Sequence, residues 1–150
     1  MNVHKRRFWL QLIGLLLVTT IVRGEQWQTD YEQALATAKG AKKCVLLNFM
    51  GSDWCPPCIA MHKTVFVKPA FLDFAQKNLT LIELDYPRRK QLPANVTEQN
   101  QRLLRQYEIE QLPTVVLLNP DGKILGKLEG YAGEGAEDVV AWVEKLCGKQ

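Results

Sequence analysis

The sequence predicts an α/β domain in which a central mixed β-sheet, with parallel strands and one antiparallel hairpin, is flanked by helices on both faces. Short, continuously apolar runs, typical of buried strands, alternate with segments whose apolar residues recur at helical spacing. Two further apolar runs are separated by Asn119-Pro120-Asp121-Gly122, a turn sequence that indicates a β-hairpin. The resulting order, helix–strand–helix–strand–helix–strand–strand–helix, implies parallel strands connected through helices.

The elements of the first half follow from spacing and end signals. Apolar residues recur at helical spacing in residues 27–38, and Gly40 ends that helix. Residues 44–49 are too few and too continuously apolar for a surface helix, so they predict a buried central strand. A helix from Pro57 to about residue 65 follows, and Pro69 begins another.

The elements of the second half are predicted in the same way. Residues 79–85 are expected to form a second strand, and a loop follows it. Thr97 is a candidate N-cap for the next helix. The remaining expected elements are a loop at 87–95, a helix at 97–107, hairpin strands at 114–118 and 124–128, and a final amphipathic helix over 139–146.

The first 24 residues are predicted to be a signal peptide rather than part of the fold. A basic segment, His4-Lys5-Arg6-Arg7, precedes an apolar stretch at residues 8–22, and Val22-Arg23-Gly24 offers small residues for cleavage. The apolar stretch has 15 residues, fewer than the roughly 20 that a membrane-spanning helix needs. An uncleaved signal anchor is the alternative. In both cases we expect an exported protein, periplasmic or extracellular, whose residues 25–150 form one domain.

Export changes how the charge is interpreted. The chain has 19 basic and 16 acidic residues, but four of the basic ones lie within the first 24 residues. The mature chain therefore has 15 basic and 16 acidic residues and a net charge of −1, so we expect no nucleic-acid partner. The short basic run Arg88-Arg89-Lys90 is interpreted as a solvated loop.

Two cysteines separated by two residues mark the candidate active site. Trp54-Cys55-Pro56-Pro57-Cys58 lies where the central strand meets the start of a helix. The N–H groups and the positive dipole end of a helix start favour a thiolate at Cys55, and Cys58 is close enough to form a disulfide with it. Half of a zinc site and a structural staple are the alternatives, but His4 and His62 are too far apart for a zinc site. We therefore expect redox chemistry, with no metal and no cofactor beyond the disulfide itself.

These motifs together resemble the thioredoxin family. The resemblance rests on the order of elements, on the cysteine motif after the first strand, and on Leu112-Pro113-Thr114 at the start of the hairpin. It covers roughly residues 25–146. The segment Gly51-Ser52-Asp53-Trp54-Cys55 and the following Val65-Phe66 are similar to exported bacterial thioredoxin-like proteins. They are also similar to the C-terminal periplasmic domain of the transmembrane thiol:disulfide interchange proteins.

The resemblance implies a thiol–disulfide oxidoreductase that acts on protein thiols and disulfides. Cys55 would be the nucleophile, Cys58 the resolving cysteine, and Trp54 a shield over the site. Pro113 would be a cis-proline beside the disulfide and, with Leu112, would position an extended strand of the partner. The motif looks more like the reducing branches of the family. We therefore expect a monomer that reduces protein disulfides and is re-reduced by a membrane or periplasmic electron donor.

Two positions depart from the thioredoxin pattern. Asn48 stands where thioredoxins have a buried aspartate that moves protons to and from the second cysteine, and asparagine cannot titrate. Glu83 stands where a lysine is common. Glu83 and His62 are therefore the candidates for proton transfer, since His62 lies four residues after Cys58 on the same helix face. The alternative is that both are ordinary surface residues, and Asp53 is expected to stabilise its own turn.

The sequence leaves undecided whether the other two cysteines pair, and it leaves two alternative functions. Cys44 begins the central strand and Cys147 ends the last helix, so both are expected at the pole opposite the active site. They form either a structural disulfide or a buried free Cys44 with a reduced Cys147. The rival functions are a non-catalytic binding module on the same fold and a metallochaperone, for which only Met61 and His62 stand near the cysteine pair.

Overall fold

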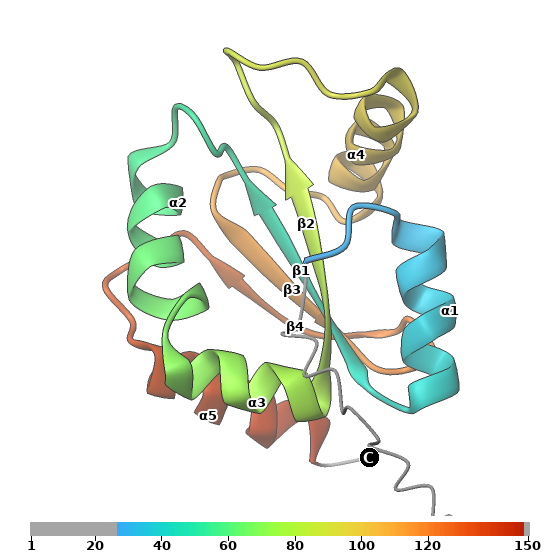
Figure 1. Cartoon of the computed structure of the whole chain (residues 1–150), viewed down its shortest axis with the longest axis vertical. Coiled ribbons are helices and arrows are strands. Elements are labelled where there is room, and N and C mark those ends of the chain that lie inside the picture. The colour runs from blue at the N-terminus through green and yellow to red at the C-terminus, as the bar shows by residue number, and fades with distance from the viewer. Residues whose placement is uncertain (1–26, 149–150) are drawn as a thin grey trace, which may run out of the picture.

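Four strands form one mixed sheet in the order β2-β1-β3-β4. The computed structural model describes residues 27–148, so the predicted signal peptide or anchor lies outside the described residues. None of the helices in the described range combines the length and the apolar character that a membrane crossing requires. The strands are β1 (Cys44–Met50), β2 (Leu79–Asp85), β3 (Thr114–Leu118) and β4 (Ile124–Glu129) (Figure 1).

The pairing of the strands confirms the predicted mixed sheet. β1 pairs with β2 in parallel and with β3 antiparallel, and β3 and β4 form the antiparallel hairpin. All seven residues of β1 are buried, as expected for a strand that is covered on both faces.

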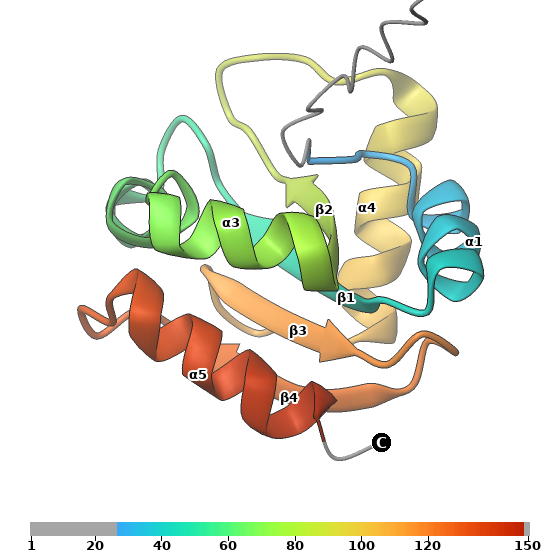
Figure 2. The same cartoon turned by 60° about the horizontal axis from the view of Figure 1, so that its bottom comes forward.

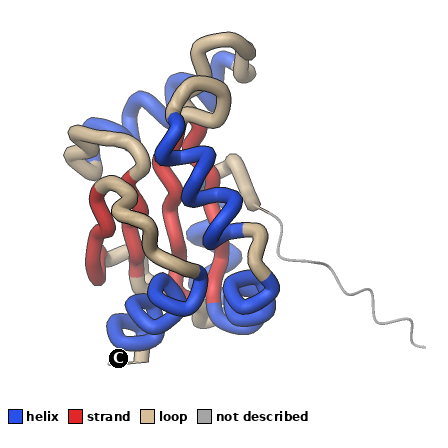
Figure 3. Tube along the Cα trace, turned by 90° about the vertical axis from the view of Figure 1, so that its left-hand side faces the viewer, coloured by secondary structure: helices blue, strands red, loops and turns tan. Residues whose placement is uncertain are grey.

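Helices cover both faces of this sheet, as the sequence predicts. Side chains alternate along β1, so Leu46 packs into the core on one face and Leu47 into the core on the other. The first core lies under α2, α3 and α5, and the second under α1 and α4 (Figures 1 and 2). Figure 3 views the molecule from the α2 side and shows helices crossing in front of the strands. The helices are α1 (Tyr31–Ala41), α2 (Pro56–Met61), α3 (Pro69–Asn78), α4 (Ala94–Gln106) and α5 (Ala136–Cys147).

Several helix boundaries differ from the prediction. α1 begins at Tyr31 rather than near residue 27, and it continues through Gly40 to Ala41. Thr97 is not the N-cap of α4, because the helix begins three residues earlier, after Pro93. The Thr97 N–H already donates to the Pro93 carbonyl at 3.0 Å, which is the first hydrogen bond of the helix. The helix expected from Pro57 to residue 65 is divided: α2 ends at Met61, and a π-helical turn follows at His62–Phe66. Such wide turns are frequent at functional sites.

The topology gathers distant parts of the chain at one edge of the sheet. β1 and β2 are parallel, so the residues that follow Met50 and Asp85 leave the sheet side by side. β3 runs in the opposite direction, and its first residue, Thr114, pairs with Phe49 near the end of β1. The cysteine motif, the start of the loop after β2 and the Leu112-Pro113 pair therefore meet at this edge.

The other two cysteines lie at the opposite end of the molecule. Cys44 begins β1 and Cys147 ends α5, and the structure joins them in a disulfide. Their Cα atoms are 6.5 Å apart, and 103 positions separate them in the sequence. A structural role for this bond remains a prediction.

Candidate active site

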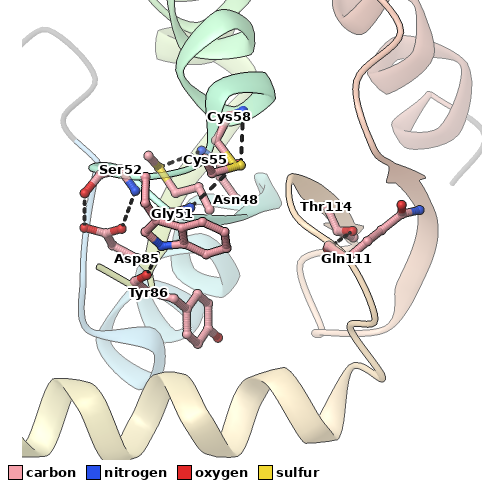
Figure 4. The surroundings of a disulfide bond; sticks show 11 residues. Asn48, Gly51, Ser52, Cys55, Cys58, Asp85, Tyr86, Gln111 and Thr114 are labelled. Carbon is pink, nitrogen blue, oxygen red and sulfur yellow. Dashed lines mark hydrogen bonds between the residues drawn. A yellow bond between two sulfur atoms is a disulfide. The ribbon is translucent and has the colours of Figure 1, made fainter. Parts of the chain in front are cut away.

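Cys55 and Cys58 form a disulfide at the start of α2 (Figure 4). Their Cα atoms are 5.3 Å apart, and only 3% and 2% of their surfaces are exposed. Cys55 is the N-cap of α2, and its Sγ accepts the N–H of Cys58 at 3.3 Å. Pro56 and Pro57 have no N–H, so Cys58 supplies the first amide donor after Cys55. The Gly51 N–H donates to the Cys58 Sγ at 3.5 Å, so both sulfurs have a backbone donor that favours the thiolate after reduction.

The Trp54 indole packs against this disulfide and is fixed from two sides. The ring contacts the small cluster of Met50, Cys55 and Cys58, and its Nε1 donates to the Tyr86 carbonyl at 2.7 Å. A Cβ at Gly51 would lie 2.6 Å from the indole, so only glycine allows the ring to pack this closely. No sequence motif signals this role of Gly51.

A buried aspartate ties the cysteine turn to β2. Asp85 is 6% exposed, and its two carboxylate oxygens accept the N–H and the hydroxyl of Ser52 at 2.9 and 2.7 Å (Figure 4). Lys90 pairs with the same carboxylate at 2.8 Å, and this hydrogen bond is the main cause that raises the pKa of Lys90. From the sequence, Asp85 is expected only as the last residue of a strand. Its place at the carboxyl end of a strand parallel to β1 was the signal that it would face the motif.

Asp53 binds the loop that follows β2. It was expected from the sequence to stabilise its own turn, and the structure corrects this expectation. Its carboxylate accepts the N–H groups of Arg88, Arg89 and Lys90 at 2.9, 2.8 and 3.3 Å. Successive N–H groups of this kind form a concave binding site for an anion. The hydrogen bond from the Arg88 N–H is the main cause that lowers the pKa of Asp53. The basic run is exposed, as a solvated loop would be, but its backbone is held against the active site.

The predicted substrate-positioning residues immediately precede β3. The Leu112–Pro113 peptide bond is cis. Pro113 is buried, and its carbonyl accepts the Gly130 N–H at 2.8 Å. Leu112 is half-buried and packs against the cluster that contains Cys55 and Cys58. That these two residues hold a partner strand remains a prediction.

Asn48 occupies a buried position on the α2 face of the sheet. It is 3% exposed and pairs in register with Glu83 on β2. Its Nδ2 donates to the Met50 Sδ at 3.4 Å, but its Oδ1 has no hydrogen-bond partner among the described residues. A buried acceptor without a partner costs about 1–3 kcal/mol. Asn48 therefore adds polarity behind the disulfide but no group that titrates.

The structure brings the two proton-transfer candidates together in one cavity. Glu83 and His62 line a cavity of about 230 Å³, together with Met50, a neighbour of Cys58. Burial is the main cause that raises the pKa of Glu83, and the charge of Asp85 adds to it, whereas Lys90 and His62 lower it. Because its pKa is raised, Glu83 can take up and release a proton at a pH above the usual carboxyl pKa. Among residues 27–148, no group of three or more His, Cys, Asp or Glu side chains is arranged to hold a metal ion.

Comparison with known sequences identifies the family. The family model of the thioredoxin-like domain matches residues 31–146. The disulfide bond reductase DsbH of Chlamydia pneumoniae is 34% identical, and the match covers 93% of this chain and 95% of that protein. The thiol:disulfide interchange protein DsbD of Pseudomonas fluorescens is 33% identical, over 69% of this chain and 17% of its own length.

Solved structures show the same arrangement of elements. The structure of a DsbH oxidoreductase matches with a TM-score of 0.78 at 27% identity, covering 100% of this chain and 95% of the other. A thioredoxin from Thermus thermophilus shares the fold with a TM-score of 0.63 at 21% identity, covering 85% of this chain and 90% of the other. These matches confirm the predicted fold and the predicted class of activity. The chain therefore belongs to the thioredoxin-like family and is a thiol–disulfide oxidoreductase.

Proposed function

We propose that this protein reduces disulfide bonds of partner proteins outside the cytoplasm. The observation that carries the proposal is the Cys55–Cys58 pair at the start of α2, in which each sulfur accepts a backbone N–H. The reducing direction is supported by the relative named as a disulfide bond reductase, which matches over nearly its whole length. Export is inferred from the basic and apolar composition of residues 1–24.

The proposed cycle moves two electrons from the enzyme to its partner. The Cys55 thiolate attacks one sulfur of the partner disulfide, forming a mixed disulfide, and the partner's other sulfur leaves and takes up a proton. Cys58 then loses its proton and attacks the Cys55 sulfur. The enzyme is left with its own disulfide, and the partner leaves with two thiols. A membrane or periplasmic thiol protein would then return the enzyme to the dithiol form.

The edge of the sheet offers a place for the partner chain. Leu112 is half-buried beside the disulfide, next to the start of β3, and Trp54 packs on the same cysteine cluster. An extended partner segment beside Leu112 and Pro113 would bring its own sulfur to Cys55. Trp54 would then limit the access of water to the mixed disulfide.

Glu83 is the group to which we assign the proton that Cys58 loses. It is partly buried on the face of the sheet that carries Met50, and its pKa is raised chiefly by burial. The cavity of about 230 Å³ that it shares with His62 is large enough to hold bridging water. His62 is less buried than the core residues around it and would pass the proton on toward solvent.

A trapping experiment tests the proposed cycle. The Cys58→Ser variant lacks the resolving thiol, so the reduced variant should accumulate a mixed disulfide through Cys55 when it is mixed with a disulfide-bonded protein such as insulin. Non-reducing gels and mass spectrometry would detect the adduct. The Cys55→Ser/Cys58→Ser double variant is the matched control and should form none. Equal behaviour of the two variants would contradict the cycle and would favour a non-catalytic binding module.

A further inference from the structure

The loop between β2 and α4 is attached to the cysteine turn at several points. Asp53 accepts three successive N–H groups from it, beginning with that of Arg88. Trp54 donates to the carbonyl of Tyr86, and Asp85 links Ser52 to Lys90. The backbone at Arg88 is therefore fixed relative to the disulfide, although the side chain of Arg88 is exposed.

The Arg88 side chain is held as well. Its guanidinium carbon lies 3.7 Å from the centroid of the Trp54 ring, a stacking distance at which cation and ring attract each other. Trp54 is itself fixed by its bond to the Tyr86 carbonyl and packs against Cys55 and Cys58. A planar guanidinium stacked in this way keeps the N–H groups at its edge free to bind a carboxylate with two hydrogen bonds.

Two acidic side chains that contact this loop, Asp53 and Asp85, already have partners. The Asp53 carboxylate is occupied by backbone N–H groups, and Asp85 is buried and pairs with Lys90. Arg89 is the arginine whose charge lowers the pKa of Asp53, whereas Arg88 acts on it through its backbone N–H. Among the described residues, no ion pair involves the Arg88 guanidinium. Within the described residues, a fixed positive charge without a carboxylate partner thus stacks on the ring that packs against the reactive disulfide.

We propose that Arg88 is a specificity-determining residue that binds a carboxylate close to the reactive cysteine of the partner protein. The enzyme would therefore prefer disulfides flanked by aspartate or glutamate. This inference rests on the proposed function, because it requires the partner sulfur to meet Cys55. The contribution is that of an exposed charge pair, which corresponds to a preference of about two- to fivefold in rate.

Three synthetic peptide disulfides that differ only in the residue beside the reactive cysteine would test this inference. Glutamate, glutamine or lysine stands at that position, and the second-order rate constant for reaction with the reduced protein is measured by acid quenching and mass spectrometry. We expect the order glutamate, glutamine, lysine, with the glutamate-to-glutamine ratio falling as salt is added. In Arg88→Gln this ratio should fall to about one.

Arg89→Gln is the matched control, since it removes the same charge one residue away. Its side chain stacks on no ring in the described part of the structure, so this variant should keep the preference for the glutamate peptide. A wild-type protein with no preference, or an Arg88→Gln variant with the wild-type ratio, would overturn the inference. An equal loss of rate for all three peptides would also overturn it, because Arg88 would then act on the Cys55 thiolate rather than on the partner. Failure of the proposed function would give a different result from failure of this inference, because none of the three peptides would react.

Discussion

At the scale of single residues, the carboxyl group of Glu83 lies in surroundings that disfavour its charged form. Burial and the neighbouring Asp85 raise its pKa, and Lys90 and His62 offset this only in part. A carboxyl group whose folded-state pKa exceeds the unfolded value binds more protons in the folded state. The free energy of unfolding therefore falls as pH rises from the ordinary glutamate value through the folded-state pKa. Near neutral pH the fold therefore keeps this carboxyl group at a cost in stability.

Replacing Glu83 by glutamine should slow the step in which Cys58 resolves the mixed disulfide. The reason is that the Cys58 proton would lose its acceptor, and a general base typically contributes a factor of about 100 or more. A preformed mixed disulfide between Cys55 and glutathione allows this step to be followed as glutathione release. In the wild type the rate should rise with pH through a pKa above the usual glutamate range, and in Glu83→Gln that rise should be absent.

His62→Gln provides the informative comparison for that measurement. The charge of His62 lowers the pKa of Glu83, so its removal should move the wild-type rise to higher pH instead of abolishing it. Glu83→Gln should also be at least as stable as the wild type near neutral pH, because it no longer buries a charge. A pH profile of Glu83→Gln that matched the wild type would exclude Glu83 as the proton acceptor.

Some site residues could be predicted from the sequence because their chemistry is local. Two cysteines with this spacing at a strand–helix junction favour a redox site over a zinc site or a structural staple. The only signal for Asp85 was its place at the carboxyl end of a strand parallel to β1. The role of Asp53 could not be recognised, since its partner Arg88 lies 35 positions away in the chain. The stacking of Arg88 on Trp54 was unpredictable for the same reason, because it depends on the hydrogen bonds that hold the loop against the cysteine turn.

At the scale of elements, strands were easier to predict than helix ends. β2 and β3 have the expected bounds, because each is a short segment rich in leucine, isoleucine or valine between clear breaks. The start of α4 was missed because Thr97 has the right side chain for a cap, whereas Pro93 and its extended backbone begin the helix. The π-helical turn at His62–Phe66 has no sequence signal of its own. It places His62 at the cavity that Glu83 lines.

At the scale of the whole molecule, two disulfides lie at opposite ends of β1. Cys55–Cys58 follows the end of the strand and closes a span of 3 residues. Cys44–Cys147 begins the strand and links it to the end of α5 across 103 residues. A bond that closes so long a span restricts the unfolded chain strongly, whereas one across 3 residues restricts it little. We therefore expect the first bond to serve chemistry and the second to serve stability.

Cys147→Ala should separate these two roles. It removes the long-range bond and leaves the buried Cys44 in place, and it should lower the free energy of unfolding by about 2–5 kcal/mol. Denaturant unfolding followed by tryptophan fluorescence measures this. The reactivity of Cys55 should stay at the wild-type level, because Cys147 lies at the far end of the sheet. Unchanged stability would mean that Cys44–Cys147 is no structural staple.

The reduction potential of the Cys55–Cys58 pair is the measurement to make first. The mature protein would be equilibrated in glutathione buffers of graded ratio, alkylated, digested and weighed, so that this pair is counted separately from Cys44 and Cys147. A disulfide reductase predicts a two-electron transition of Cys55 and Cys58 together, at a potential near or below about −230 mV. A potential above about −150 mV would identify an oxidant or isomerase instead, and a pair that never cycles would contradict redox catalysis altogether.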